Sequence, residues 1–73
     1  MEKYKVKLWC RKYTGSVDVD TKEETTTLIE AKQLLSALAE DIRKNHLKYI
    51  DYESVSLSIS YNGKDIERKY VLC

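Results

Sequence analysis

The 73-residue sequence contains few of the residues on which catalysis and metal binding usually depend: two glycines, one histidine and two cysteines. Two glycines cannot supply a glycine-rich phosphate-binding loop. The single histidine, His46, has no partner in the sequence pattern that would orient it as a base toward a serine or a cysteine. Three widely spaced Cys and His residues do not make a zinc site, and Asp18 and Asp20 lack the rest of an EF-hand loop. We therefore expect a protein that is not an enzyme and that needs no metal or cofactor.

Long apolar runs are also missing. No run approaches the roughly 20 residues that span a bilayer, and the first residues, MEKYKVKLWC, contain no apolar stretch long enough for a signal peptide. Cys10 falls inside an expected strand and Cys73 is the last residue, unlike the closely spaced cysteines of small secreted domains. These features predict reduced thiols, a cytoplasmic location and no membrane association.

Hydrophobic residues make up 42% of the chain and charged residues 34%, a mixture typical of a folded domain. The length allows a single domain, residues 1–73, close to the lower limit at which one apolar core supports a fold. The 13 basic and 12 acidic residues leave a formal charge of +1. Nucleic-acid-binding domains usually have a larger basic surplus, so the net charge does not indicate such a partner.

Residues 3–13, KYKVKLWCRKY, alternate between two faces as a half-buried strand does. One face has Tyr4, Val6, Leu8 and Cys10, and the other has Lys3, Lys5, Lys7, Trp9, Arg11 and Tyr13. Thr14-Gly15 is suited to a two-residue hairpin loop. Such a loop would place Arg11 opposite Asp18 on a second, short strand, where the unlike charges support the pairing.

A helix is predicted after a polar connector, residues 21–27. Thr27 followed by Glu30 fits a capping box at the start of the helix. Apolar residues then recur at steps of three and four, as on one face of an amphipathic helix: Leu28, Ala31, Leu35, Leu38 and Ile42. Basic residues follow in the last turn, where positive charge suits the helix dipole.

The stretch SVSLSISY, residues 54–61, alternates serine with apolar residues and predicts a strand with one buried face. Asn62-Gly63 is a strong hairpin signal, because both residues tolerate positive φ. A two-residue turn there would place Ile59 opposite Ile66 and add Ile66 to the core. The serines would then lie on the sheet face that the helix leaves open, where their hydroxyls contact water.

The order hairpin–helix–hairpin (ββαββ) predicts an α+β fold in which a four-stranded mixed sheet carries one helix on one face. If the first and last strands are neighbours in the centre, they run parallel. This arrangement resembles the β-grasp fold of ubiquitin-like domains and of immunoglobulin-binding bacterial modules. The resemblance concerns element order only, since the diglycine tail of conjugated ubiquitin-like proteins is absent, and it implies little about function.

Protein binding is the function that the sequence favours. Trp9 is the only tryptophan, and the alternation places it on the open face between Lys7 and Arg11. Trp, Tyr and Arg are enriched at interface hot spots. We expect an apolar anchor from Trp9 and Val71, with Lys7, Arg11 and Tyr13 contacting the partner around it. The partner would be another protein, or alternatively a second copy of the chain, and the role that of an adaptor, regulator or inhibitor, as for small phage or mobile-element proteins.

Binding of single-stranded nucleic acid is the alternative function. Its candidate residues are the cations and the ring on the outer face of the first strand: Lys3, Lys5, Lys7, Trp9 and Arg11. Single-strand binders combine such cations for phosphates with aromatic rings for bases. The expected registers place acidic residues on the same face, where they would neutralise much of the positive potential: Asp18, Asp20, Asp65 and Glu67.

Overall fold

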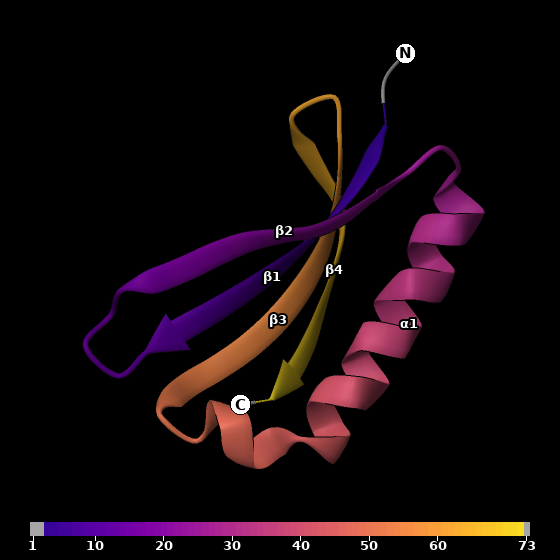
Figure 1. Cartoon of the computed structure of the whole chain (residues 1–73). Coiled ribbons are helices and arrows are strands. Elements are labelled where there is room, and N and C mark those ends of the chain that lie inside the picture. Colours follow the sequence, from indigo (N-terminus) through magenta and orange to yellow (C-terminus); the bar gives the residue numbers. More distant parts are fainter. Residues whose placement is uncertain (1–2, 73) are drawn as a thin grey trace.

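The computed structural model describes residues 3–72, which form one open four-stranded sheet with a single α-helix across one face (Figure 1). In chain order the elements are β1 (Tyr4–Lys12), β2 (Val17–Thr25), α1 (Leu28–Lys44), the 3₁₀ helix η1 (His46–Tyr49), β3 (Tyr52–Tyr61) and β4 (Lys64–Leu72). The fold is therefore of the α+β class, as the sequence predicts.

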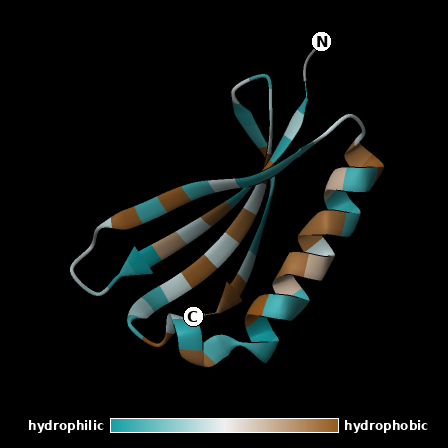
Figure 2. Cartoon of the chain, in the orientation of Figure 1, coloured by the Kyte–Doolittle hydropathy of each residue, from teal (hydrophilic) through white to brown (hydrophobic). Residues whose placement is uncertain are grey.

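The strand order differs from the β-grasp expectation. The sheet has the order β2-β1-β3-β4, and every neighbouring pair is antiparallel, so the sheet is not mixed and β1 does not pair with β4. The physical reason lies in the apolar faces. β1 and β3 carry the most apolar alternation, so placing them together in the centre puts both apolar faces under α1 (Figure 2). β4, whose residues are mostly charged, takes an edge instead.

The core is formed between α1 and the two central strands. Its buried members are Val6, Leu8 and Cys10 of β1, Val55, Leu57 and Ile59 of β3, and Ala31, Leu35, Ala39 and Ile42 of α1. The two alanines allow the helix backbone to approach the sheet closely. Leu28 and Leu38 pack against this cluster but remain partly exposed. The alternation predicted for residues 3–13 thus has the correct phase.

The helix begins at the predicted cap. The Glu30 backbone N–H donates to Thr27 Oγ1 (3.2 Å), and the Thr27 hydroxyl donates to Glu30 Oε1 (2.9 Å). At the other end the Asn45 backbone N–H donates to the Asp41 carbonyl (3.0 Å). The short η1 helix then leads into β3.

The first hairpin turns through three residues, not two. The Lys12 N–H donates to the Ser16 carbonyl (2.8 Å), and the Gly15 N–H donates to the Lys12 carbonyl (2.9 Å). Gly15 has φ 98°, which glycine adopts without steric cost. The extra loop residue shifts the pairing by one, so Arg11 lies opposite Val17 and not opposite Asp18.

β2 is longer than predicted and includes residues 21–25 of the expected connector. A β-bulge at Lys22 interrupts its pairing with β1. The tip of the β1–β2 hairpin extends away from α1, so that nearly all β2 side chains are exposed (Figure 1).

The second hairpin has the predicted turn but not the predicted register. Asn62 and Gly63 both have positive φ, at 53° and 79°. Ser60 pairs with Asp65 as expected, but a bulge at Ile66 then places Glu67 opposite Ile59. Ile66 is consequently 49% exposed, and its assignment to the core is wrong.

Candidate binding surface on the open sheet face

The sheet face opposite α1, called the open face below, is defined by the strand registers, because residues directly opposite each other point to the same side. It comprises Lys5, Lys7, Trp9 and Arg11 of β1, Val17, Val19, Thr21 and Glu24 of β2, Ser54, Ser56, Ser58 and Ser60 of β3, and Asp65, Arg68 and Tyr70 of β4. Long side chains from β1 and β4 therefore flank a central row of serines.

The central serines are buried, contrary to the expectation that water covers them. Ser58 is 0% exposed, and Ser56 and Ser60 are 4% exposed each. Among residues 3–72 no helix lies on this side of the sheet, so the cover comes from the long neighbouring side chains on β1 and β4. Ser54 and Ser56 line one hollow on this face, and Ser60 lines another.

Trp9 lies over Ser58, between these two hollows. Its indole Nε1–H donates to Ser58 Oγ (2.7 Å), and the Arg68 guanidinium lies 4.3 Å from the centre of the ring. Arg68 also contacts the Asp65 carboxylate at 3.4 Å. The predicted face of Trp9 is correct, but the ring is half-buried, its polar group is satisfied within the protein, and an arginine covers it.

The first of two hollows on the open face lies between Trp9 and the β1–β2 hairpin, with a volume of about 290 Å³. It is lined by Trp9, Arg11, Val17, Glu53, Ser54, Ser56, Arg68 and Tyr70. Apolar groups are exposed around it: Val17 (41%), Val19 (48%) and Tyr70 (63%). We call this the aromatic hollow.

The second hollow, of about 380 Å³, lies on the other side of Trp9. Its lining is Lys3, Lys5, Lys7, Glu24, Ser60, Asn62 and Gly63. We call it the lysine hollow. The basic stripe predicted for residues 3–11 is thus divided: three lysines line one hollow, and Arg11 lines the other beside Trp9.

Two of the predicted contact residues lie elsewhere. Val71 is displaced by an irregularity in the β3–β4 pairing and packs against the core, so it does not adjoin Trp9 as an exposed anchor. Tyr70 takes that place. Tyr13 is 72% exposed in the hairpin loop. The register shifts explain why Val17, Val19, Arg68 and Tyr70 were missed, because a one-residue slip exchanges the faces of a strand.

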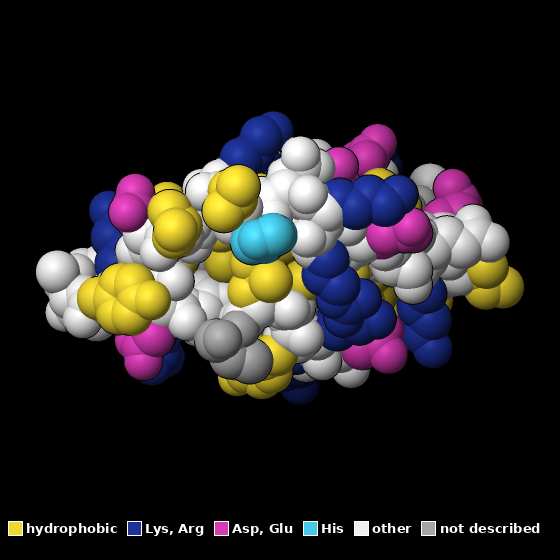
Figure 3. All heavy atoms as spheres, turned by 90° about the horizontal axis from the view of Figure 1, so that it is seen from below, with side chains coloured by type: hydrophobic (Ala, Val, Ile, Leu, Met, Phe, Trp, Pro, Cys, Tyr) yellow, Lys and Arg dark blue, Asp and Glu magenta, His cyan; other side chains and the backbone are white. Residues whose placement is uncertain are grey.

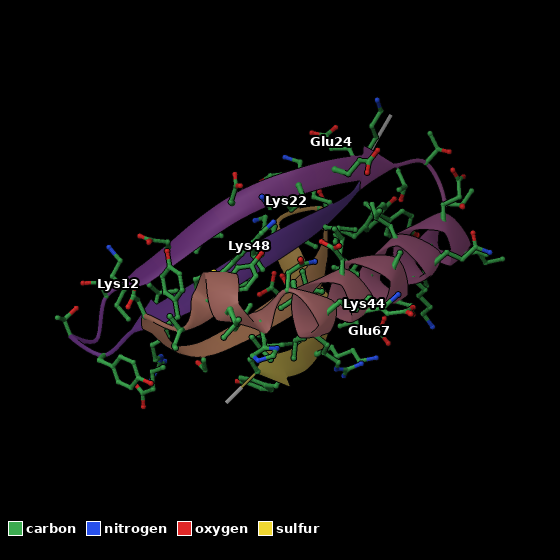
Figure 4. All side chains as sticks on the ribbon, turned by 60° about the horizontal axis from the view of Figure 1, so that its bottom comes forward. Lys12, Lys22, Glu24, Lys44, Lys48 and Glu67 are labelled. Carbon is green, nitrogen blue, oxygen red and sulfur yellow. The ribbon has the colours of Figure 1, made fainter. Side chains whose placement is uncertain are left out.

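The acidic residues of β2 do not share the open face. Asp18 lies opposite Cys10 and Asp20 opposite Leu8, which places both carboxylates on the helix side of the sheet. There Asp18 contacts Lys12 at 3.6 Å and Asp20 contacts Lys22 at 3.0 Å. The hydrogen bond that the Lys22 ammonium donates to the Asp20 carboxylate raises the pKa of Lys22. Figure 4 shows Lys12 near the β1–β2 hairpin, Lys22 midway along β2, and Glu24 nearer the end of β2 that leads to α1.

Most of the acidic residues expected beside the basic stripe therefore lie on the other face of the sheet. Glu67, opposite Ile59, also lies on the helix side, so only Asp65 of the four expected neutralising residues is on the open face. Among residues 3–72, Lys5, Lys7 and Arg11 form no ion pair. The open face is more basic than the sequence registers predicted.

Two residues with reactive side chains lie away from this surface. His46 is exposed beside apolar side chains (Figure 3), with Nδ1 3.3 Å from the Arg43 carbonyl. Cys10 is a free, buried thiol whose pKa is raised by burial and, secondarily, by Asp18. Cys73, whose thiol is also predicted to be reduced, lies outside the described residues. Within the described part of the chain, no three His, Cys, Asp or Glu side chains are grouped to hold a metal ion.

None of the helices described between residues 3 and 72 combines the length and the apolar character needed to cross a membrane. Comparison of the chain with protein-family models, with curated proteins and with solved structures found no match.

Proposed function

We propose that this protein is a non-enzymatic binding module that docks a partner protein through the open face, with the aromatic hollow as its centre. The observation that carries the proposal is the grouping of Trp9, Tyr70, Arg11 and Arg68 around one concave site. Tryptophan, tyrosine and arginine are the residues in which binding energy concentrates at protein interfaces.

The aromatic hollow is also preorganised. The bond to Ser58 and the stacked Arg68 hold the indole in one position, so little side-chain freedom would be lost when a partner binds. The exposed Val17 and Val19 beside it extend the apolar area, and apolar side chains contribute nothing to phosphate binding. Both features favour a protein partner.

The sheet edges are less suited to binding by strand addition. The β2 edge is charged and bulged at Lys22, and β4 is interrupted by the bulge at Ile66. Bulges and charged side chains are features that protect exposed edges from pairing.

A second copy of the chain docking face to face would bring like charges together, so we propose a different protein as the partner. In this proposal the module acts as an adaptor, regulator or inhibitor in the cytoplasm, where the free thiol of Cys10 would stay reduced.

The test is affinity capture from nuclease-treated host lysate, followed by titration of the captured protein after purification. Tyr70→Ala removes an exposed ring at the hollow, and Leu47→Ala is a matched control, since Leu47 is 70% exposed on η1. We expect Tyr70→Ala to weaken binding by about 30-fold or more, the effect of losing a hot-spot residue. Leu47→Ala should leave binding unchanged. Equal binding by both variants would contradict docking at the open face.

Binding of single-stranded nucleic acid remains the second candidate, because one observation favours it. Asp18, Asp20 and Glu67 were expected to neutralise the basic stripe, and they lie on the other side of the sheet. A nucleic-acid complex would weaken steeply as salt rises, and Lys5→Gln with Lys7→Gln would abolish it. In a protein complex the same changes would mainly slow association.

A further inference from the structure

We propose that the segment bound by the open face is an extended acidic peptide of the partner, with an apolar side chain in the aromatic hollow and carboxylates in the lysine hollow. The inference rests on the proposed docking function and adds the chemistry of the partner.

The two hollows are spaced for an extended chain that lies along β3. Strands β1 and β4 flank β3, and neighbouring strands lie about 4.8 Å apart, so the backbones of β1 and β4 are roughly 10 Å apart. Between the two hollows Trp9 and Arg68 meet over β3, and a bound segment would pass over them. Ser56 lines one hollow and Ser60 lines the other. Four residues of strand cover about 13 Å. A bound segment that follows β3 would therefore place its apolar residue and its carboxylates about four residues apart.

The charges on the two sides of Trp9 favour an acidic segment. Lys5, Lys7 and Arg11 form no ion pair within residues 3–72, whereas the lysines on the helix side, Lys12 and Lys22, are paired with aspartates. Glu24 and Glu53 are the carboxylates that line the two hollows, fewer than the cations there. A partner with carboxylates would complete this pattern through charge-assisted hydrogen bonds.

The position of Arg68 argues against single-stranded nucleic acid as the occupant. Binding of that kind uses exposed rings on which bases stack. Here Arg68 covers the Trp9 ring at 4.3 Å, and the indole N–H is already bound to Ser58. The exposed groups nearest to the indole include Val17, Tyr70 and Arg11, which fit an apolar side chain beside a carboxylate.

Two synthetic peptides without tryptophan test the inference, with Trp9 emission and backbone amide NMR shifts as the measurements. The acidic peptide is Ser-Leu-Ser-Thr-Ser-Glu-Glu-Ser, and the matched neutral peptide has Gln at both Glu positions. We expect the acidic peptide to bind about tenfold more tightly, in line with the greater strength of charge-assisted hydrogen bonds. The double variant Lys5→Gln, Lys7→Gln should remove this difference. Lys32→Gln, on α1, is the control that should not.

Three results would contradict the inference. Equal binding of both peptides, no shift at millimolar peptide, or tighter binding of an oligothymidylate of similar length would overturn the acidic-peptide proposal. If the captured partner still requires Tyr70 in such a case, docking at the open face survives and only the acidic chemistry is wrong. If Tyr70→Ala also has no effect on capture, the proposed function is wrong as well.

Discussion

The hydroxyl of Ser58 accepts the only indole N–H of the protein, across 49 positions of sequence and between the two central strands. Ser58→Ala would leave that N–H without its acceptor beneath Arg68, where water has restricted access. We expect a loss of about 1 kcal/mol in the free energy of unfolding, the usual net value of such a bond. We also expect red-shifted Trp9 emission and stronger quenching by iodide, because the ring is released toward solvent.

Ser54→Ala is the matched control for this prediction. Ser54 lies on the same strand and the same face but makes no side-chain hydrogen bond among the described residues. Equal changes in emission for the two variants would show that the bond to Ser58 does not position the indole. The aromatic hollow would then lack the preorganisation on which the docking proposal relies.

At the scale of the elements, α1 depends on its first turn, because the helix is amphipathic and its cap is exposed. Thr27→Ala removes the acceptor of the Glu30 N–H and should lower the free energy of unfolding by about 1 kcal/mol, measured by urea denaturation. Thr26→Ala is the control, since the Thr26 hydroxyl reaches only the Glu30 side chain, at 3.3 Å. A loss for Thr26→Ala as large as that for Thr27→Ala would argue against the cap.

The sequence predicts the individual elements better than their pairing. Element types, the phase of β1 and β3, the helix start and the Asn62-Gly63 turn were predictable, because each depends on a local pattern of a few residues. The strand order and both hairpin registers were not. A three-residue loop at Gly15 and bulges at Lys22 and Ile66 each add one residue to a strand pairing, and alternation alone does not indicate them.

These single-residue insertions determine which residues of the binding surface the sequence could predict. Trp9 and Arg11 were placed correctly because β1 itself is regular over that stretch. Tyr70 and Arg68 were missed because the Ile66 bulge exchanges the faces of β4, and Val71 was misplaced by a second irregularity near the end of that strand. The strand pairing also decides which acidic residues share a face with the cations of β1, and the total charge of +1 does not indicate this.

At the scale of the whole molecule, the core consists of one layer of side chains between α1 and the sheet, and its end toward the first hairpin is occupied by Cys10. A domain of 73 residues is marginally stable, so a single polar change in the core should unfold a large fraction of the protein. Ionisation of the Cys10 thiol is such a change. It places a charge in the core next to Asp18, a carboxylate on the same side of the sheet.

Stability should therefore decrease at alkaline pH. Burial, and then Asp18, raise the pKa of the Cys10 thiol in the folded protein, so the unfolded chain loses this proton first. The contribution is fully present below the ordinary thiol pKa of about 8.5 and is lost as pH rises through the folded pKa above it. In a Cys73→Ser background, the urea midpoint should fall as pH rises above about 8.5. Adding Cys10→Ala should flatten that fall, because alanine has no proton to lose, whereas equal slopes in the two proteins would assign the alkaline loss to other groups.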